Sequence, residues 1–370
     1  MRQKILGRIL GIALLLYGSA ALAFTLILPE QYTPSNVITD PVTLEPQVQA
    51  IAGSIRTQVF SHLRPRRADK VTQASRVLAA NSYVGSRSDA DYLAAAPGDD
   101  SGGSGGIGAR DGSAVWISAL TNSLENEFSR TAFYGATHNL IAGYDLTRSD
   151  RYVLGVSFGH EASNFVTSFN AGDQRTRGFN LNPYFAYLLS DSWSVDLILG
   201  YGQFNTRQSR TTGSVAPPAT VAVTSDYASS RGFVSSNLTN VSNWGDWKLT
   251  GSVGGLASKR KQDAYMESDG TSVPALTTDT ITQWNLLGEI AYGRGKSEGF
   301  VGALYENTRD PQKTQLLGSP QPADDPDSVL VTAGWRYYGK GLTASFVFST
   351  RLAQEDIREY GFSMLMRFDL

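Results

Sequence analysis

The three histidines are the residues of this chain best suited to acid–base chemistry, and their spacing can be tested against a hydrolase site. A serine hydrolase needs a Ser nucleophile and a His base on the same face, with a third group that orients the base. His160 and Ser163 are three residues apart in a strand-like segment, so they point to opposite faces. No serine lies two residues from His138, and His62 falls at the end of a predicted helix. With no cysteine and no metal-ligand spacing either, the sequence predicts no enzyme, no cofactor and no metal site.

A second set of chemically capable residues consists of charges on the polar face of alternating segments. In a membrane barrel such charges point into the lumen, because facing lipid is costly. They could form a structural network, which we favour, or they could hold a helix or select what passes, as charged rings do in pores. Glu289 lies deepest in its strand, and Arg64, Arg66 and Arg67 are candidate partners for it. The candidate lumen charges are Asp145, Asp196, Glu289, Arg336, Arg367 and Asp369.

The elements that must position these charges read as long amphipathic strands. In the last eleven residues, Phe362, Met364, Met366, Phe368 and Leu370 share one face, and Leu365 is the one apolar residue opposite. Twelve runs of this kind, each of roughly ten residues or more, follow one another from residue 114 to the end. We therefore predict an all-β fold, a twelve-stranded antiparallel transmembrane β-barrel over 114–370, with a preceding α-helix as a candidate occupant of the lumen.

The connections between the predicted strands alternate in length. Turns are short near 147–150, 190–191, 243–246, 293–297 and 338–341, whereas 211–222 and 311–326 are long. This asymmetry is typical of outer-membrane barrels, whose short turns face the periplasm. Tryptophan favours the headgroup layer, and five of the six tryptophans lie near the predicted short-turn ends. The predicted membrane-interface aromatics are Trp116, Trp193, Trp244, Trp247 and Trp335.

The N-terminal third of the chain is organised differently. Residues 1–23 have the charged, apolar and A-x-A regions of a cleavable signal peptide, and 24–43 form a short polar segment. Apolar residues then recur every three or four positions, which predicts an amphipathic helix over 44–63 within a helical segment 44–81. A Gly/Ser-rich linker, 82–113, leads to the barrel. The candidate pore-helix residues are Val48, Ile55, Val59, Phe60, Leu63 and Arg64.

Several short motifs, taken in order, resemble a bacterial autotransporter β-domain of the type V secretion class. They are Trp116 opening the first strand, 143–145 (GYD), 154–157 (LGVS), 181–184 (LNPY) and 199–202 (LGYG), and the resemblance covers roughly 110–370. It implies a twelve-stranded barrel with a helix threaded through the pore, a passenger carried to the cell surface, and insertion by the barrel-assembly machinery with periplasmic chaperones. Only about twenty residues separate Phe24 from the helix, so the passenger is vestigial.

Composition agrees with an exported membrane protein and argues against nucleic acid. The formal net charge is −2, without a basic stripe, and 37 glycines accompany 11% aromatic residues. We predict a monomeric barrel in the outer membrane of a Gram-negative bacterium, in contact with outer-membrane lipid. Its predicted function is to export or display the short N-terminal segment at the cell surface. The alternative is a stand-alone pore or adhesin-like barrel with no passenger.

Overall fold

In the part of the chain that the structure describes, long antiparallel strands form a closed barrel around one helix. The computed structural model describes residues 26–28, 44, 46–59, 112–149, 151–212, 221–277, 280–309, 314–316, 323 and 325–370. The predicted signal peptide, residues 82–111 of the predicted linker 82–113, and Phe60, Leu63 and Arg64 of the candidate pore helix lie outside the described residues. Gly112 and Ser113, predicted as linker, belong to the first barrel strand. In the part of the chain that is described, no helix has the length and apolarity needed to cross a membrane.

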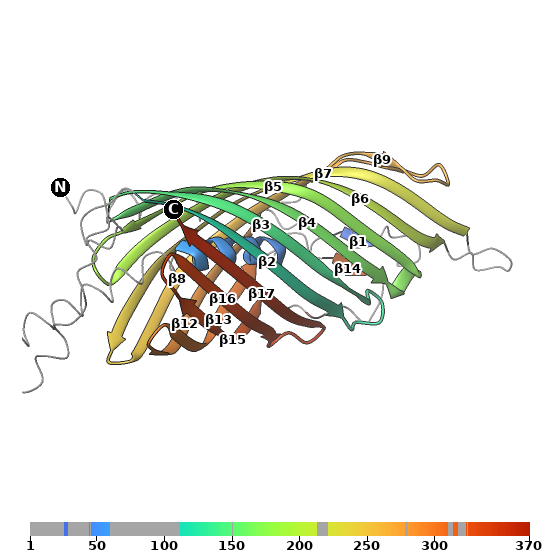
Figure 1. Cartoon of the computed structure of the whole chain (residues 1–370). Coiled ribbons are helices and arrows are strands. Elements are labelled where there is room, and N and C mark those ends of the chain that lie inside the picture. The colour runs from blue at the N-terminus through green and yellow to red at the C-terminus, as the bar shows by residue number, and fades with distance from the viewer. Residues whose placement is uncertain are drawn as a thin grey trace, which may run out of the picture.

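Twelve strands close the barrel, and each corresponds to one strand predicted from the sequence. Neighbours pair in chain order, and the ring closes where the last strand, β17, pairs with the first, β2. The predicted all-β, twelve-stranded antiparallel barrel is therefore confirmed (Figure 1). The strands are β2 (Gly112–Asn126), β3 (Phe133–Ser149), β4 (Tyr152–Thr167), β5 (Gly172–Leu188), β6 (Trp193–Thr212), β7 (Val221–Trp244), β8 (Trp247–Gln262), β12 (Ile281–Arg294), β13 (Ser297–Arg309), β15 (Asp327–Tyr338), β16 (Leu342–Leu352) and β17 (Ile357–Asp369).

Short elements outside the barrel wall lie in the connections at the long-loop end. Strand β9 (Tyr265–Met266) pairs with β10 (Ser272–Val273), and β11 (Leu276–Thr277) pairs with β8; a 3-10 turn, η2, covers Ser168–Asn170. Strand β1 (Leu26–Leu28) runs parallel to β14 (Thr314–Leu316), which lies between β13 and β15. These short strands were not predicted, because two or three residues are too few to show a period of two.

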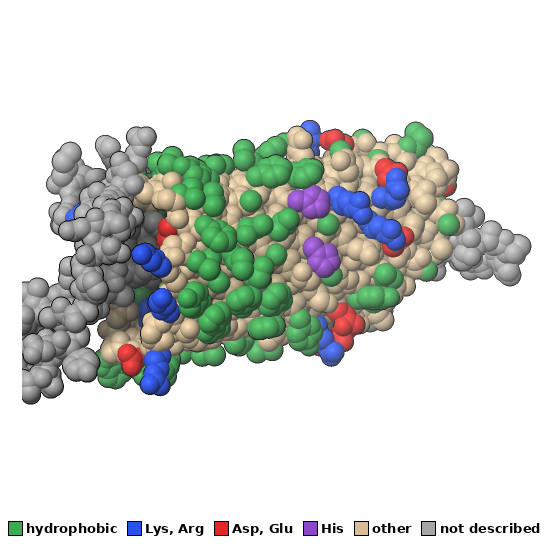
Figure 2. Space-filling model, viewed as in Figure 1, with side chains coloured by type: hydrophobic (Ala, Val, Ile, Leu, Met, Phe, Trp, Pro, Cys, Tyr) green, Lys and Arg blue, Asp and Glu red, His purple; other side chains and the backbone are tan. Residues whose placement is uncertain are grey.

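The outer surface of the barrel carries a broad apolar band. Leucine, valine and aromatic side chains of every long strand point outward toward the short-turn end and centre, and Figure 2 shows the band clearly. Toward the long-loop end, the outward face carries more polar and charged side chains among fewer apolar ones (Figure 2). An apolar band bounded by polar rims is the surface that a bilayer requires of a spanning barrel.

One tryptophan was assigned to the wrong face. Trp116 is only 2% exposed and points into the lumen, where its indole N–H donates to the Tyr184 hydroxyl at 2.8 Å. Its cross-strand partner is Gly143, where an added Cβ would lie 2.2 Å from the indole ring, so only glycine leaves room for the ring to lie flat. The prediction relied on the distance of Trp116 from a turn. The alternation of side chains along the strand decides the face, and it places Trp116 on the same side as Ala114 and Ser118. Trp193, Trp244, Trp247 and Trp335 are exposed on the outer surface near short turns.

Candidate functional site

The lumen is the candidate functional site, and one helix occupies it. Residues 44 and 46–59 form this element, here called the lumen helix, and Figure 1 shows it inside the ring of strands. Pro46 stands in its first turn, where a missing backbone N–H costs nothing. The described helix ends at Val59, inside the predicted range 44–63.

An apolar stripe fixes one side of the lumen helix to the barrel wall. Leu44, Val48, Ile51, Ile55 and Val59 are buried, as the three- and four-residue spacing requires. They pack against inward-facing side chains from much of the wall, at about 1.5–3 kcal/mol for each large side chain removed from water. The wall residues of this core are Trp116, Leu120, Ile141, Val153, Tyr184, Ala186, Ile198, Phe233, Leu256, Ile281 and Leu365.

Polar contacts fix the helix at its end nearest the short turns. Gln58 donates to the Asp145 carboxylate, to which the Tyr184 hydroxyl also donates. Arg367 Nε lies 3.8 Å from the same carboxylate and so adds a positive charge to this cluster. Asp145 and Arg367, two of the predicted lumen charges, therefore meet at the C-terminal part of the helix.

Further polar contacts follow the helix toward the long-loop end. Arg56 Nε lies 3.5 Å from Asp196, which is another predicted lumen charge. The Ser118 hydroxyl donates to Ser54 at 3.2 Å. The order of these contacts along the wall shows that the chain enters the helix at the long-loop end and leaves it at the short-turn end.

The contact nearest the long-loop end involves residues that were missed in the sequence. Arg231 Nη1 donates to Gln47 at 2.7 Å, and Arg231 Nη2 pairs with Glu161 at 2.6 Å. The alternation of side chains in the sequence could have predicted that both residues point into the lumen. Glu161 follows the outward His160, and Arg231 lies two residues from the inward Phe233. The sequence could not have predicted that Glu161 and Arg231 pair, because β4 and β7 are not neighbouring strands.

Opposite the apolar stripe, the wall carries a second group of buried charges, here called the wall network: Glu289, Glu298, Glu306, Arg336, Arg351 and Glu359. Arg336 pairs with Glu289 at 2.6 Å and with Glu298 at 2.8 Å. Glu289 thus has its partner on the wall itself, while Arg64, Arg66 and Arg67 lie outside the described residues.

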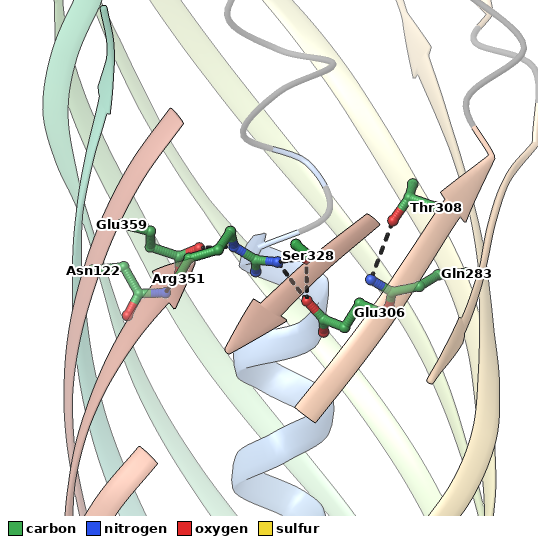
Figure 3. A network of polar contacts seen from close by, with 7 residues as sticks. All are labelled: Asn122, Gln283, Glu306, Thr308, Ser328, Arg351 and Glu359. Carbon is green, nitrogen blue, oxygen red and sulfur yellow. Dashed lines mark hydrogen bonds and ion pairs between the residues drawn. The ribbon is translucent and has the colours of Figure 1, made fainter. Parts of the chain in front are cut away.

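Figure 3 shows the other half of the wall network. Arg351 contacts the Glu306 carboxylate, the Glu359 carboxylate at 2.7 Å and the Ser328 hydroxyl at 2.6 Å. Asn122 donates to Glu359 at 3.2 Å, which links the network to β2. Asp369 lies differently from the other predicted lumen charges: its side chain is 55% exposed at the end of β17, where it pairs with Arg367 at 2.9 Å.

A cavity of about 220 Å³ separates the lumen helix from the wall network. Ala50, Gly53 and Thr57 line it on the helix side, and Arg336 and Arg351 line it on the wall side. The helix therefore fills only part of the lumen. Its apolar side is packed, and its small, polar side borders open space.

The open space beside Gly53 predicts the effect of a small substitution. A Cβ added at Gly53 meets nothing within 4 Å, so Gly53→Ala should stabilise the helix by about 1 kcal/mol through helix propensity alone. Amide hydrogen exchange of residues 47–59 would slow accordingly. Ala50→Gly, which borders the same cavity, is the matched control and should speed exchange by a similar factor. Equal exchange rates in the two variants would contradict this prediction.

His160 and Ser163 lie on opposite faces of their strand, as the sequence predicted, and His62 lies outside the described residues. His160 is on the outer surface, where its ring lies 5.1 Å from that of Phe179, whereas Ser163 is buried on the lumen side. His138 Nδ1 lies 3.1 Å from Thr121 Oγ1, a pair that only the β2–β3 register brings together. Among the described residues, no group of three or more His, Asp or Glu side chains could hold a metal ion.

A closed twelve-stranded barrel, an apolar outer band and a helix through the lumen define an outer-membrane translocator. Residues 115–303 match the family described as autotransporter β-domain, so the chain belongs to that family. Its function is that of an outer-membrane autotransporter-type barrel. The family is one of transport barrels rather than catalytic ones.

Two solved structures with a similar fold are domains of autotransporters. The translocator domain of the autotransporter NalP from Neisseria meningitidis has a TM-score of 0.58 and 14% identity, covering 70% of this chain and 88% of that one. The β-domain of the Bordetella autotransporter BrkA has a TM-score of 0.57 and 16% identity, covering 70% and 99%. No curated protein sequence matches this chain significantly.

Proposed function

We propose that this barrel exports its own N-terminal segment, residues 24–43, and displays it at the cell surface. The observation that carries the proposal is the path of the chain. The lumen helix runs through the barrel with Gln47 toward the long-loop end and Gln58 toward the short-turn end. Strand β1 precedes the helix and pairs with β14, which belongs to a connection at the long-loop end.

The orientation follows from the family and from the lengths of the connections. Short turns of outer-membrane barrels face the periplasm, so the long-loop end faces outward. A cleavable signal peptide over 1–23 would deliver the chain to the periplasm. The barrel-assembly machinery and periplasmic chaperones would then insert it, with β17 and its outward Phe362 and Phe368 as the terminal strand. The linker up to residue 111 would lie on the periplasmic side, since β2 begins at that end.

The proposal assigns no catalysis to the barrel. A hydrolase reading would need His160 and Ser163 to act together, and the barrel wall separates them. The two halves of the lumen have different roles here. The apolar core and the helix contacts of Asp145, Asp196 and Arg231 retain the helix, and the wall network keeps the opposite side polar.

The test is the accessibility of residue 30 on intact cells. An epitope tag inserted after Pro29 should be cleaved by external protease without permeabilising the outer membrane. A tag in the short turn at Gly295 is the periplasmic control and should be cleaved only after permeabilisation. A tag within 213–220, in a long connection, is the external control. Protection of residue 30 together with Gly295 would exclude export and favour a stand-alone pore or adhesin-like barrel.

A further inference from the structure

A group of basic side chains lies on the outside of the barrel, at the edge of the apolar band that faces the long-loop end. It consists of His138 on β3, His160 on β4, Arg175 and Arg177 on β5, and Arg207 on β6, and we call it the outer basic patch. All five side chains alternate with buried lumen residues, so they point away from the barrel. Figure 2 shows two histidines near the end of the apolar band, one of them beside basic side chains.

The strand register brings these basic side chains together. Arg175 and Arg207 are direct cross-strand partners on the outer face. Arg177 is opposite Ala162, which in turn is opposite His138. Like charges directly opposite in a sheet are destabilising, so this arrangement calls for a compensating anion.

Carboxylates of the protein compensate only part of this charge. Arg175 Nε lies 3.3 Å from Asp173, and Arg207 Nε lies 2.9 Å from Asp226. Both arginine side chains remain largely exposed, at 63% and 76%. Arg177 forms no ion pair with any of the described residues. The patch therefore keeps a positive excess with free guanidinium donors.

The apolar surface beneath the patch is continuous with it. Leu140, Phe158 and Phe179 are exposed immediately on the short-turn side. Phe158 and Phe179 stack with ring centroids 5.4 Å apart, and His160 lies over Phe179. A ligand that fits both surfaces carries acyl chains and, at the depth of the headgroup, anionic oxygens.

The position of the outer basic patch along the membrane normal indicates which kind of anion it contacts. It lies on the long-loop side of the apolar band, which in an outer-membrane barrel is the outer leaflet. Guanidinium groups bind phosphate through paired, charge-assisted hydrogen bonds, and basic clusters beside a spanning segment attract anionic headgroups. A phosphate-bearing headgroup of a lipid in that leaflet meets both requirements.

We propose that the outer basic patch binds the phosphorylated headgroup of an outer-leaflet glycolipid, with the acyl chains lying on Leu140, Phe158 and Phe179. Binding at this site fixes the height of the barrel in the membrane on the side of β3–β6. The proposal rests on the outer-membrane location and is independent of the export of residues 24–43.

Lipid retention by the purified full chain tests the proposal. The protein in neutral detergent is mixed with lipid A carrying two phosphates, and bound lipid is counted by native mass spectrometry. Replacing Arg175, Arg177 and Arg207 with Ser should lower the apparent affinity about tenfold or more, since each surface cation contributes to headgroup binding. The matched control replaces Lys259, Lys261 and Arg309 with Ser. These residues are also exposed and outward-facing, and their removal changes the net charge equally but should leave retention unchanged.

Three results would overturn the proposal. Equal loss of lipid A in the patch and control variants would mean that retention reflects net charge alone. Equal retention of dephosphorylated lipid A would show that only the acyl chains are bound. Displacement of the lipid by inorganic phosphate at equal concentration would assign the site to a free anion. A folded barrel in each variant is verified by its heat-modifiable mobility in gel electrophoresis.

Discussion

Deleting residues 24–80 should raise the single-channel conductance of the barrel several-fold. The lumen helix occupies a cylinder about 10–12 Å across when its side chains are included. Its removal would open the space between the apolar wall core and the wall network, leaving a polar path lined by Arg336 and Arg351. The intact chain, with only the cavity of about 220 Å³ beside the helix, should conduct weakly. Planar-bilayer recordings of the two proteins measure the difference.

A deletion confined to the predicted linker is the matched control for this experiment. Removing residues 98–106 shortens the chain and leaves the helix sequence intact, so conductance should stay at the level of the full chain. The same conductance with and without residues 24–80 would mean that the helix does not occupy the lumen of the inserted protein. That result would contradict the threaded path on which the proposed export depends.

Arg351→Met should lower the free energy of unfolding of the barrel by about 3–5 kcal/mol, because it leaves buried charges without their partner. The side chains of Arg351, Glu306 and Glu359 are 4%, 0% and 4% exposed. Without the guanidinium, the two buried carboxylates, which come from different strands, have no cation between them (Figure 3). Urea unfolding of the protein in lipid vesicles, followed by tryptophan fluorescence, measures the loss.

Two further variants make this result specific to the wall network. Arg358, one strand away on β17, is 60% exposed and pairs with Glu127 at 2.9 Å. Arg358→Met should therefore cost less than about 1 kcal/mol, as exposed pairs do. Combining Arg351→Met with Glu306→Gln and Glu359→Gln should recover most of the loss, since no unpaired charge remains. Comparable losses from Arg351→Met and Arg358→Met would show that the network carries little of the stability.

The sequence was sufficient for the barrel wall and for the face of most residues. Each of the twelve strands alternates for ten residues or more, and a pattern of that length identifies both the strand and its outward side. Trp116 shows why position along the chain is not sufficient. Its place near a turn suggested the membrane interface, but the alternation of its strand places the side chain in the lumen. The three-residue strands β1 and β14 had no pattern that could be read.

The pairing of the lumen charges could be predicted only in part. The alternation of side chains along each strand was enough to identify five inward-facing charges, and all five are buried: Asp145, Asp196, Glu289, Arg336 and Arg367. Five further charges also fall on the lumen face of their strands and were overlooked: Glu161, Arg231, Glu306, Arg351 and Glu359. The partners of these charges come from other strands, some of them across the lumen, at sequence separations that no local pattern contains.

What the sequence determined by itself was therefore everything that depends on local periodicity: twelve amphipathic strands, one amphipathic helix, and the alternation of short and long connections. The tertiary structure decided what depends on closure of the ring. Pairing of β17 with β2 creates the lumen, and only a closed lumen sets Gln47 against Arg231, Gln58 against Asp145, and a cavity beside Gly53. The physical reason is that the face on which a side chain lies is a property of one strand, whereas the distance across a barrel depends on all twelve strands together.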